Sequence, residues 1–239
     1  MLDERQARID LAAAYRWAVR FGLNEGISNH FSVALDDARF LINPHGLHWS
    51  EITASGILVC DEDGNVLEGE HPVEPTALFI HGQVHKACPQ ATCVMHTHMP
   101  YATALSMLED GRLEPVEQNA IRFHGKVAYD DDYNGLALDK AEGQRLAAKV
   151  GNNRVLFLAN HGVVVGGPNV AEAFDDLYYL ERALKFQVLA RSTGLPFRKI
   201  PEDIVDQTVE QMGGERETAR LHFEALKRIL DKEEPDYAH

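Results

Sequence analysis

Apolar side chains recur at helical spacing over the first twenty residues. The positions Ile9, Ala12, Ala13, Trp17 and Val19 fall three to four residues apart, so one face of a helix over residues 3–20 is apolar. Gly22 interrupts this pattern, as expected of a residue just past a helix end. The chain therefore opens with a helix packed against a core.

Beyond this helix the pattern changes to short strand-like runs. FSVAL (31–35), RFLIN (39–43) and GILVC (56–60) predict strands, and Asp63-Gly64 predicts a hairpin turn before NVLEG (65–69). ATCVMHTH (91–98) has the apolar and β-branched content of a buried strand. RVLFLAN (154–160) and HGVVVGG (161–167) are of the same kind and predict a hairpin or tight bend.

Helix-start signals separate these strands. Pro75 occupies the first position of a helix that follows Glu74 and continues through TALFIHGQVHKA (76–87). Asp139 with Glu142, and Asn169 with Glu172, form capping boxes, and the second of these opens a long helix that ends by Gly194. A last helix is expected over about 215–231. Disorder is expected at most in the acidic tail DKEEPDYAH (231–239).

The order of these elements indicates the fold class. Strands and helices alternate without the regular crossover units, about thirty residues each, that a parallel sheet requires. We therefore expect an α/β protein with a mixed, mostly antiparallel sheet and helices on its faces. No internal repeat or linker divides the 239 residues, so residues 1–239 are expected to form a single domain.

Composition excludes several classes of partner. The formal charge is −14, with 37 acidic residues against 23 basic ones, which argues against binding to nucleic acid or to an anionic membrane surface. No run approaches eighteen apolar residues, and five of the first ten residues are charged, so a cytoplasmic protein is expected. Cys60, Cys88 and Cys93 lack the spacing of a zinc or redox motif and are expected to be reduced, mostly structural thiols.

Histidine is the anomaly in the composition, with twelve residues in the chain. Side chains alternate along a strand, so His96 and His98 point to the same face and can reach one cation. His161 follows a second apolar strand, where Gly162 permits a sharp turn. Three histidines with an open fourth position are typical of a catalytic metal site. The alternative is a chance pair on a solvated strand with His161 in a turn, but the apolar flanks favour the metal site.

In three stretches, the sequence resembles the class II aldolase and adducin family. The resemblance lies in HGLHWSEITASGILVCDEDGNVLEG (45–69), PVEPTALFIHGQVHKACPQATCVMHTHMP (72–100) and FLANHGVVVGG (157–167). It implies a three-layer α/β/α domain, a divalent metal on His96, His98 and His161, and a homotetramer. The family includes sugar-phosphate aldolases, an epimerase, a dehydratase, decarboxylases and the non-enzymatic adducin heads, so membership leaves the function open.

The chain departs from the aldolase pattern at the acid/base group. The glutamate of the sugar-phosphate aldolases corresponds to Ala77, which has no carboxylate. Glu74 lies about one helical turn earlier, so its side chain can serve as a fourth metal ligand or as a proton shuttle. Alternatively, Glu74 only complements the start of the helix at Pro75.

The anion pocket of the family is also altered. The residues that match its phosphate-binding positions are His30, His45-Gly46 and Pro75-Thr76. Imidazoles in place of hydroxyls favour a carboxylate or an aromatic hydroxy acid over a sugar phosphate. The alternative is that His30 and His45 only satisfy loop carbonyls. The other histidines considered are assigned structural roles: His48, His71, His81, His85 and His124.

These features predict a metal-dependent carbon–carbon lyase. A divalent ion acts as a Lewis acid and takes up the negative charge of an enolate. Decarboxylation needs only this electron-accepting ion and, afterwards, a group that donates a proton. The expected substrate is a small hydroxy- or oxo-carboxylate, cleaved by decarboxylation or a retro-aldol step. Glu74, Glu117 and Tyr133 are the candidate donors, and the favoured metal is zinc, with manganese, cobalt or iron as alternatives. A sugar-phosphate epimerase and an adducin-like binding module are the competing functions.

Overall fold

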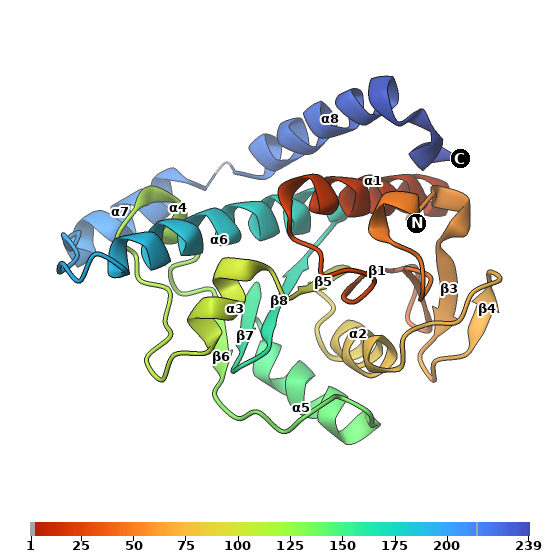
Figure 1. Ribbon diagram of the computed structural model, residues 1–239, viewed down its shortest axis with the longest axis horizontal. Coiled ribbons are helices and arrows are strands. Elements are labelled where there is room, and N and C mark those ends of the chain that lie inside the picture. Colours follow the sequence, from red (N-terminus) through yellow and green to blue (C-terminus); the bar gives the residue numbers. More distant parts are fainter. Residues whose placement is uncertain (1–2, 214) are drawn as a thin grey trace.

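The computed structural model describes residues 3–213 and 215–239, and its described strands form one sheet (Figure 1). The order across the sheet is β4-β3-β2-β1-β5-β8-β7-β6, and every pairing except β6–β7 is antiparallel. The predicted mixed, mostly antiparallel sheet is thus confirmed. The strands are β1 (His30–Ala34), β2 (Arg39–Ile42), β3 (Leu58–Asp61), β4 (Val66–Glu68), β5 (Cys93–Thr97), β6 (Val127–Asp130), β7 (Val155–Leu158) and β8 (Gly162–Gly167).

Helices cover both faces of this sheet, which makes the three-layer arrangement (Figure 1). α2 and α5 pack together on one face, whereas α1, α3, α6 and α8 lie on the other. The α-helices are α1 (Glu4–Phe21), α2 (Pro75–Ala87), α3 (Pro100–Ser106), α4 (Gln118–Ile121), α5 (Lys140–Val150), α6 (Val170–Arg191), α7 (Glu202–Gln211) and α8 (Glu215–Glu233). Short 3₁₀ turns follow at η1 (Trp49–Glu51), η2 (Ala54–Gly56) and η3 (Pro235–Ala238). None of the described helices is long and apolar enough to cross a bilayer.

The predicted helix signals act as caps. Asp139 accepts a hydrogen bond from the Glu142 amide, and Asn169 accepts one from the Glu172 amide, so α5 and α6 begin where the capping boxes indicate. Gly22 ends α1 in the left-handed region at φ 67°. The hairpin turn at Asp63-Gly64 is also confirmed, because β3 and β4 pair antiparallel on either side of it.

Strand alternation divides the interior into two layers. In β5, Cys93 and Met95 face the large core beneath α1 and α6, while Val94 joins the core between the sheet and α2 and α5. His96 has the same parity as Val94 and therefore lies on the α2 face. The three cysteines are buried and unpaired, as expected of reduced structural thiols.

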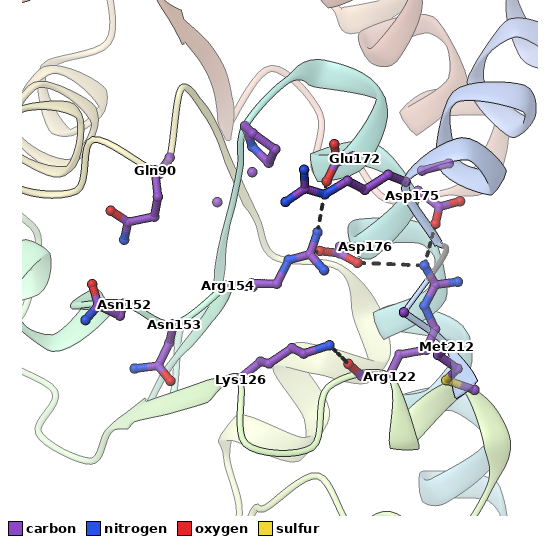
Figure 2. Close-up of a pocket in the computed structure, with 17 residues that line it drawn as sticks. Gln90, Arg122, Lys126, Asn152, Asn153, Arg154, Glu172, Asp175, Asp176 and Met212 are labelled. Carbon is purple, nitrogen blue, oxygen red and sulfur yellow. Dashed lines mark hydrogen bonds and ion pairs between the residues drawn. The ribbon is translucent and has the colours of Figure 1, made fainter. Parts of the chain in front are cut away.

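A polar cavity of about 400 Å³ lies at the end of β8 that is remote from His161 (Figure 2). Two of its basic side chains, Arg122 and Arg154, are paired with acidic side chains from α6. Arg154 Nε is 2.9 Å from Asp176, and Arg122 bonds Asp175 at 2.5 Å. None of the three predicted metal-ligand histidines lines this cavity.

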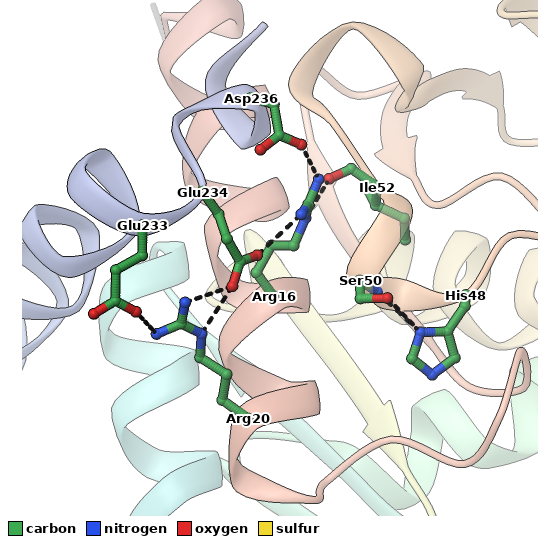
Figure 3. Close-up of polar contacts among 8 residues, drawn as sticks. All are labelled: Arg16, Arg20, His48, Ser50, Ile52, Glu233, Glu234 and Asp236. Carbon is green, nitrogen blue, oxygen red and sulfur yellow. Dashed lines mark hydrogen bonds and ion pairs between the residues drawn. The ribbon is translucent and has the colours of Figure 1, made fainter.

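The C-terminal tail is ordered, so the disorder that the sequence allowed at most over residues 231–239 is not found there. Arg16 of α1 bonds Asp236 at 2.7 Å and Glu234 at 3.0 Å, and its Nε donates to the carbonyl oxygen of Ile52 (Figure 3). The Tyr237 ring is buried, with 2% of its surface exposed. Acidic composition suggested a solvated tail, but its charges meet basic partners on α1 and its one aromatic ring completes the core.

Replacing Arg16 with methionine is expected to lower the free energy of unfolding by about 2 kcal/mol, because the carbonyl oxygen of the buried Ile52 would lose its hydrogen bond and Asp236 would lose its ion pair. Arg20→Met is the matched control, since Arg20 binds the same tail but its side chain is 25% exposed. Its cost should stay below about 1 kcal/mol. Urea unfolding followed by circular dichroism measures the free energy of unfolding of both variants. Equal losses in the two variants would contradict a special stabilising role for the buried Arg16.

Candidate metal centre

Three histidines from the ends of two neighbouring strands converge on one point. His96 is the penultimate residue of β5, His98 follows that strand, and His161 directly precedes β8. One nitrogen from each ring lies within 4.8 Å of the others. The ring centroids are 4.6–5.0 Å apart. The antiparallel pairing of β5 with β8 explains this convergence, because the end of one strand meets the start of the other.

Hydrogen bonds to outer acceptors orient two of these rings. Nδ1 of His96 lies 3.0 Å from the carbonyl oxygen of Val163, and Nδ1 of His98 bonds the carboxylate of Glu25. A carbonyl and a carboxylate can only accept, so both Nδ1 atoms carry the proton. The two Nε2 atoms then present lone pairs to each other at 3.1 Å.

This donor set fits a divalent metal ion. Two imidazole nitrogens on a tetrahedral zinc ion are separated by about 3.3 Å, which is close to the spacing of the His96 and His98 Nε2 atoms. Burial lowers the pKa of His161 to about 4 and holds the pKa of His96 well below its usual value, so both rings are neutral near pH 7. An outer acceptor on each orienting nitrogen is also typical of metal-binding histidines.

His30 lies next to this centre but is not an open loop residue. It is directly opposite His96 in the β1–β5 pairing, and the two rings stack at 4.9 Å. Only 3% of His30 is exposed, and its Nδ1 bonds Nε2 of His81 on α2 at 2.7 Å. The site assignment of His30 remains a prediction, while the contact with His81 shows that one of its two nitrogens is already occupied.

Glu74 has the capping role that was one of its two alternatives. Its Oε2 accepts the Ala77 amide at 2.9 Å and the hydroxyl hydrogen of Thr76. The same oxygen lies 3.7 Å from Nε2 of His30, so the cap is also adjacent to the histidines. Ala77 itself is buried in an apolar cluster with Phe40, so the helix offers no carboxylate at that position.

His45 and Gly46 lie on the loop that follows β2. The His45 amide donates to the Pro72 carbonyl at 2.8 Å, which places the loop beside the segment leading into α2. Nδ1 of His45 is buried and has no hydrogen-bond partner among the described residues. Gly46 is exposed in the left-handed region at φ 92°, which a side chain would disfavour.

The remaining candidates differ in their distance from the histidines. Tyr133 is 56% exposed and lines the same small cavity as His161. Glu117 caps α4 by accepting the amides of Asn119 and Ala120, and none of its described hydrogen bonds reaches a histidine.

Sequence reasoning missed several residues around the centre. Glu25 stands in an irregular loop, where no periodic pattern indicates that it reaches His98. The sequence predicts only structural roles for His81 and His85, which lie four residues apart on α2. Their contacts with Ser32 and His30 depend on how α2 is rotated against the sheet, which local sequence does not encode.

Comparison with known proteins identifies the family of the chain. The model of the Class II Aldolase and Adducin N-terminal domain matches residues 9–188. A putative aldolase class 2 protein of Caulobacter vibrioides is 37% identical over 98% of this chain and 93% of its own length. An adducin-related protein of Schizosaccharomyces pombe is 34% identical over 98% of this chain and 77% of its own length.

A solved structure supports the same assignment. The crystal structure of an aldolase II superfamily protein from Pseudomonas syringae has a TM-score of 0.90 at 36% identity, covering 100% of this chain and 97% of that one. The resemblance inferred from the three sequence blocks is therefore confirmed. The chain belongs to the class II aldolase and adducin family.

Proposed function

We propose that this protein is a metal-dependent carbon–carbon lyase that acts on a small hydroxy- or oxo-carboxylate by decarboxylation or retro-aldol cleavage. The observation that carries the proposal is the convergence of His96, His98 and His161, with nitrogens within 4.8 Å of one another and no fourth protein ligand in that group among the described residues. A structural zinc site normally has four protein ligands, whereas a catalytic site keeps a position for substrate.

The three histidines would hold a divalent ion. Zinc is favoured by the imidazole ligands, with manganese, cobalt or iron as alternatives. When bound, such an ion polarises a substrate carbonyl as a Lewis acid.

The protein's own residues would bind the substrate and move its protons. Glu74 is the proposed acid/base group, because its carboxylate lies beside His30 and is 26% exposed. His45 is proposed to bind the substrate anion, because its buried Nδ1 lacks a partner among the described residues and can donate. Gly46 and Thr76 would complete that pocket, and Tyr133 is the proposed proton donor on the His161 side.

Two other functions compete with this one. The adducin-like alternative is a binding module without catalysis, and it has support from the 34% identity to an adducin-related protein. A sugar-phosphate epimerase would use the same metal ligands, but His30 and His45 replace hydroxyl and amide donors of the phosphate pocket. A homotetramer and a cytoplasmic location remain predictions.

The purified protein is expected to contain close to one equivalent of divalent metal, or to take it up from zinc, manganese or cobalt solutions. Metal at about 100 times its dissociation constant should stabilise the fold by about 2.7 kcal/mol, because only the folded chain brings the three ligands together. His161→Ala should lose both effects, as measured by mass spectrometry and thermal unfolding.

His124→Ala is the matched control, because this histidine is exposed and its described ion pair is with Asp206, away from the centre. It should bind metal like the parent protein. Absence of metal from the parent, together with no uptake of the added ions, would favour the binding module.

Glu74→Gln is expected to lower turnover at least about 100-fold, the usual size of a general acid/base contribution. Assays with hydroxy-keto acids and hydroxylated aromatic carboxylates would follow release of carbon dioxide or aldehyde. Glu117→Gln is the control, since Glu117 is also a helix-capping glutamate and should cost a similar amount of stability, about 1 kcal/mol or less. Full turnover by Glu74→Gln, with loss of turnover in His96→Ala, would reject the role of Glu74 and retain the metal centre.

A further inference from the structure

A chain of buried polar side chains runs from His30 along the contact between β1 and α2. Nδ1 of His30 lies 2.7 Å from Nε2 of His81, and Nδ1 of His81 lies 2.5 Å from the Ser32 hydroxyl. The same hydroxyl lies 2.6 Å from Nε2 of His85, whose Nδ1 lies 3.0 Å from the carbonyl oxygen of Ala91. We call Ser32, His81 and His85 the relay.

The carbonyl at the far end fixes the direction of every hydrogen bond in this chain. A carbonyl only accepts, so His85 carries its proton on Nδ1 and its Nε2 accepts from Ser32. Ser32 has one hydroxyl hydrogen, so its oxygen must accept from Nδ1 of His81. Nε2 of His81 is then an acceptor, and it receives the Nδ1 proton of His30.

This assignment requires that each relay histidine carries a single proton. Burial lowers the pKa of His85 to about 4 and holds the pKa of His81 well below its usual value. Both rings are therefore neutral near pH 7, and only one assignment of donors and acceptors along the chain is possible.

This assignment of donors and acceptors leaves a lone pair on Nε2 of His30, the nitrogen that faces Glu74. Oε2 of Glu74 is 3.7 Å away and is itself an acceptor, since it already receives the Ala77 amide and the Thr76 hydroxyl. Two acceptors that face one another are complemented by a hydrogen-bond donor, and a carboxylate placed there would be repelled. The stack of His30 on His96 puts this point beside the metal centre.

We propose that the relay fixes the Nδ1–H form of His30, so that His30 Nε2 and Glu74 receive a substrate hydroxyl group beside the metal centre. This inference rests on the proposed function and narrows its substrate class to acids that carry a hydroxyl. It also reverses the predicted role of His30, which becomes an acceptor for a hydroxyl instead of a donor to the carboxylate. The carboxylate of the substrate would then bind elsewhere in the site, for example at His45.

Nitrogen NMR of the metal-free protein near neutral pH tests the relay without substrate or turnover. The expected spectrum has a protonated Nδ1 and an unprotonated Nε2 for His30, His81 and His85. In Ser32→Ala the relay is interrupted, and His30 should redistribute toward the Nε2–H form. Ser106→Ala is the matched control, because the hydroxyl of this buried serine bonds the Thr103 carbonyl and no other group among the described residues, and it should leave the His30 signals unchanged.

Two outcomes would overturn the relay: a protonated Nε2 on His30 in the parent protein, or an unchanged His30 signal in Ser32→Ala. If Ser32→Ala does not fold, His85→Gln makes the same test, because it removes the ring that binds the Ala91 carbonyl.

Calorimetry on the zinc-loaded protein tests the hydroxyl site with glycolate and its methyl ether, methoxyacetate. Glycolate should bind about tenfold more tightly, as expected for one hydrogen bond to a charged acceptor, and Ser32→Ala should reduce this ratio to about threefold or less. A ratio near one in the parent protein would contradict the hydroxyl site, and a tenfold ratio that persists in Ser32→Ala would contradict its dependence on the relay. Failure of both acids to bind would contradict the proposed function itself, and in that event the NMR spectrum still decides the relay.

Discussion

The organisation of the site depends on one constraint, which is that a buried neutral imidazole must find an acceptor for its single N–H group. His30, His81 and His96 are each at most 3% exposed. An unpaired donor at such a position would cost about 1–3 kcal/mol. The Val163 carbonyl accepts from His96 and the Ala91 carbonyl from His85, while the carboxylate of Glu25 accepts from His98. Each of these N–H groups therefore points away from the centre. As a consequence, the lone pairs of His96 and His98 point to the centre. Hydrogen bonds made outside the candidate metal site therefore orient the nitrogen atoms that would bind the ion.

Strand register makes this arrangement possible. His30 is opposite His96, and Ser32 is opposite Val94, so one face of β1 and β5 carries the polar row beneath α2. A slip of β1 by one residue would turn His30 and Ser32 into the core beneath α1, where Phe31 now stacks on Tyr15 at 4.8 Å. The burial of Phe31 therefore holds His30 on the metal side, and the apolar core and the polar row stabilise the same register.

Local patterns predicted the parts of the site that depend on one strand or one helix end. The alternation in residues 91–98 placed His96 and His98 together, and Glu74 with Pro75 marked the start of α2. Long-range packing lay outside that reasoning. The pairing of β6 parallel to β7 and the helix α7 were not predicted, because their short segments have no clear period. The order of the tail depends on Arg16, more than two hundred residues away. The contact of Glu25 with His98 likewise joins two loops that only the fold brings together.

The energetics of the polar layer also bear on function. A buried hydrogen bond contributes only about 1 kcal/mol net, and apolar side chains of similar shape often stabilise a core equally well. The α2 face already follows that apolar pattern elsewhere, where Val94 packs against Ile80 and Val84. Stability alone does not require imidazoles at His30, His81 and His96. A protein that only binds a partner would use its outer surface and would not need these buried rings either. Neutral rings with oriented lone pairs are what the proposed chemistry at the centre would require, and this difference favours the lyase over the adducin-like module.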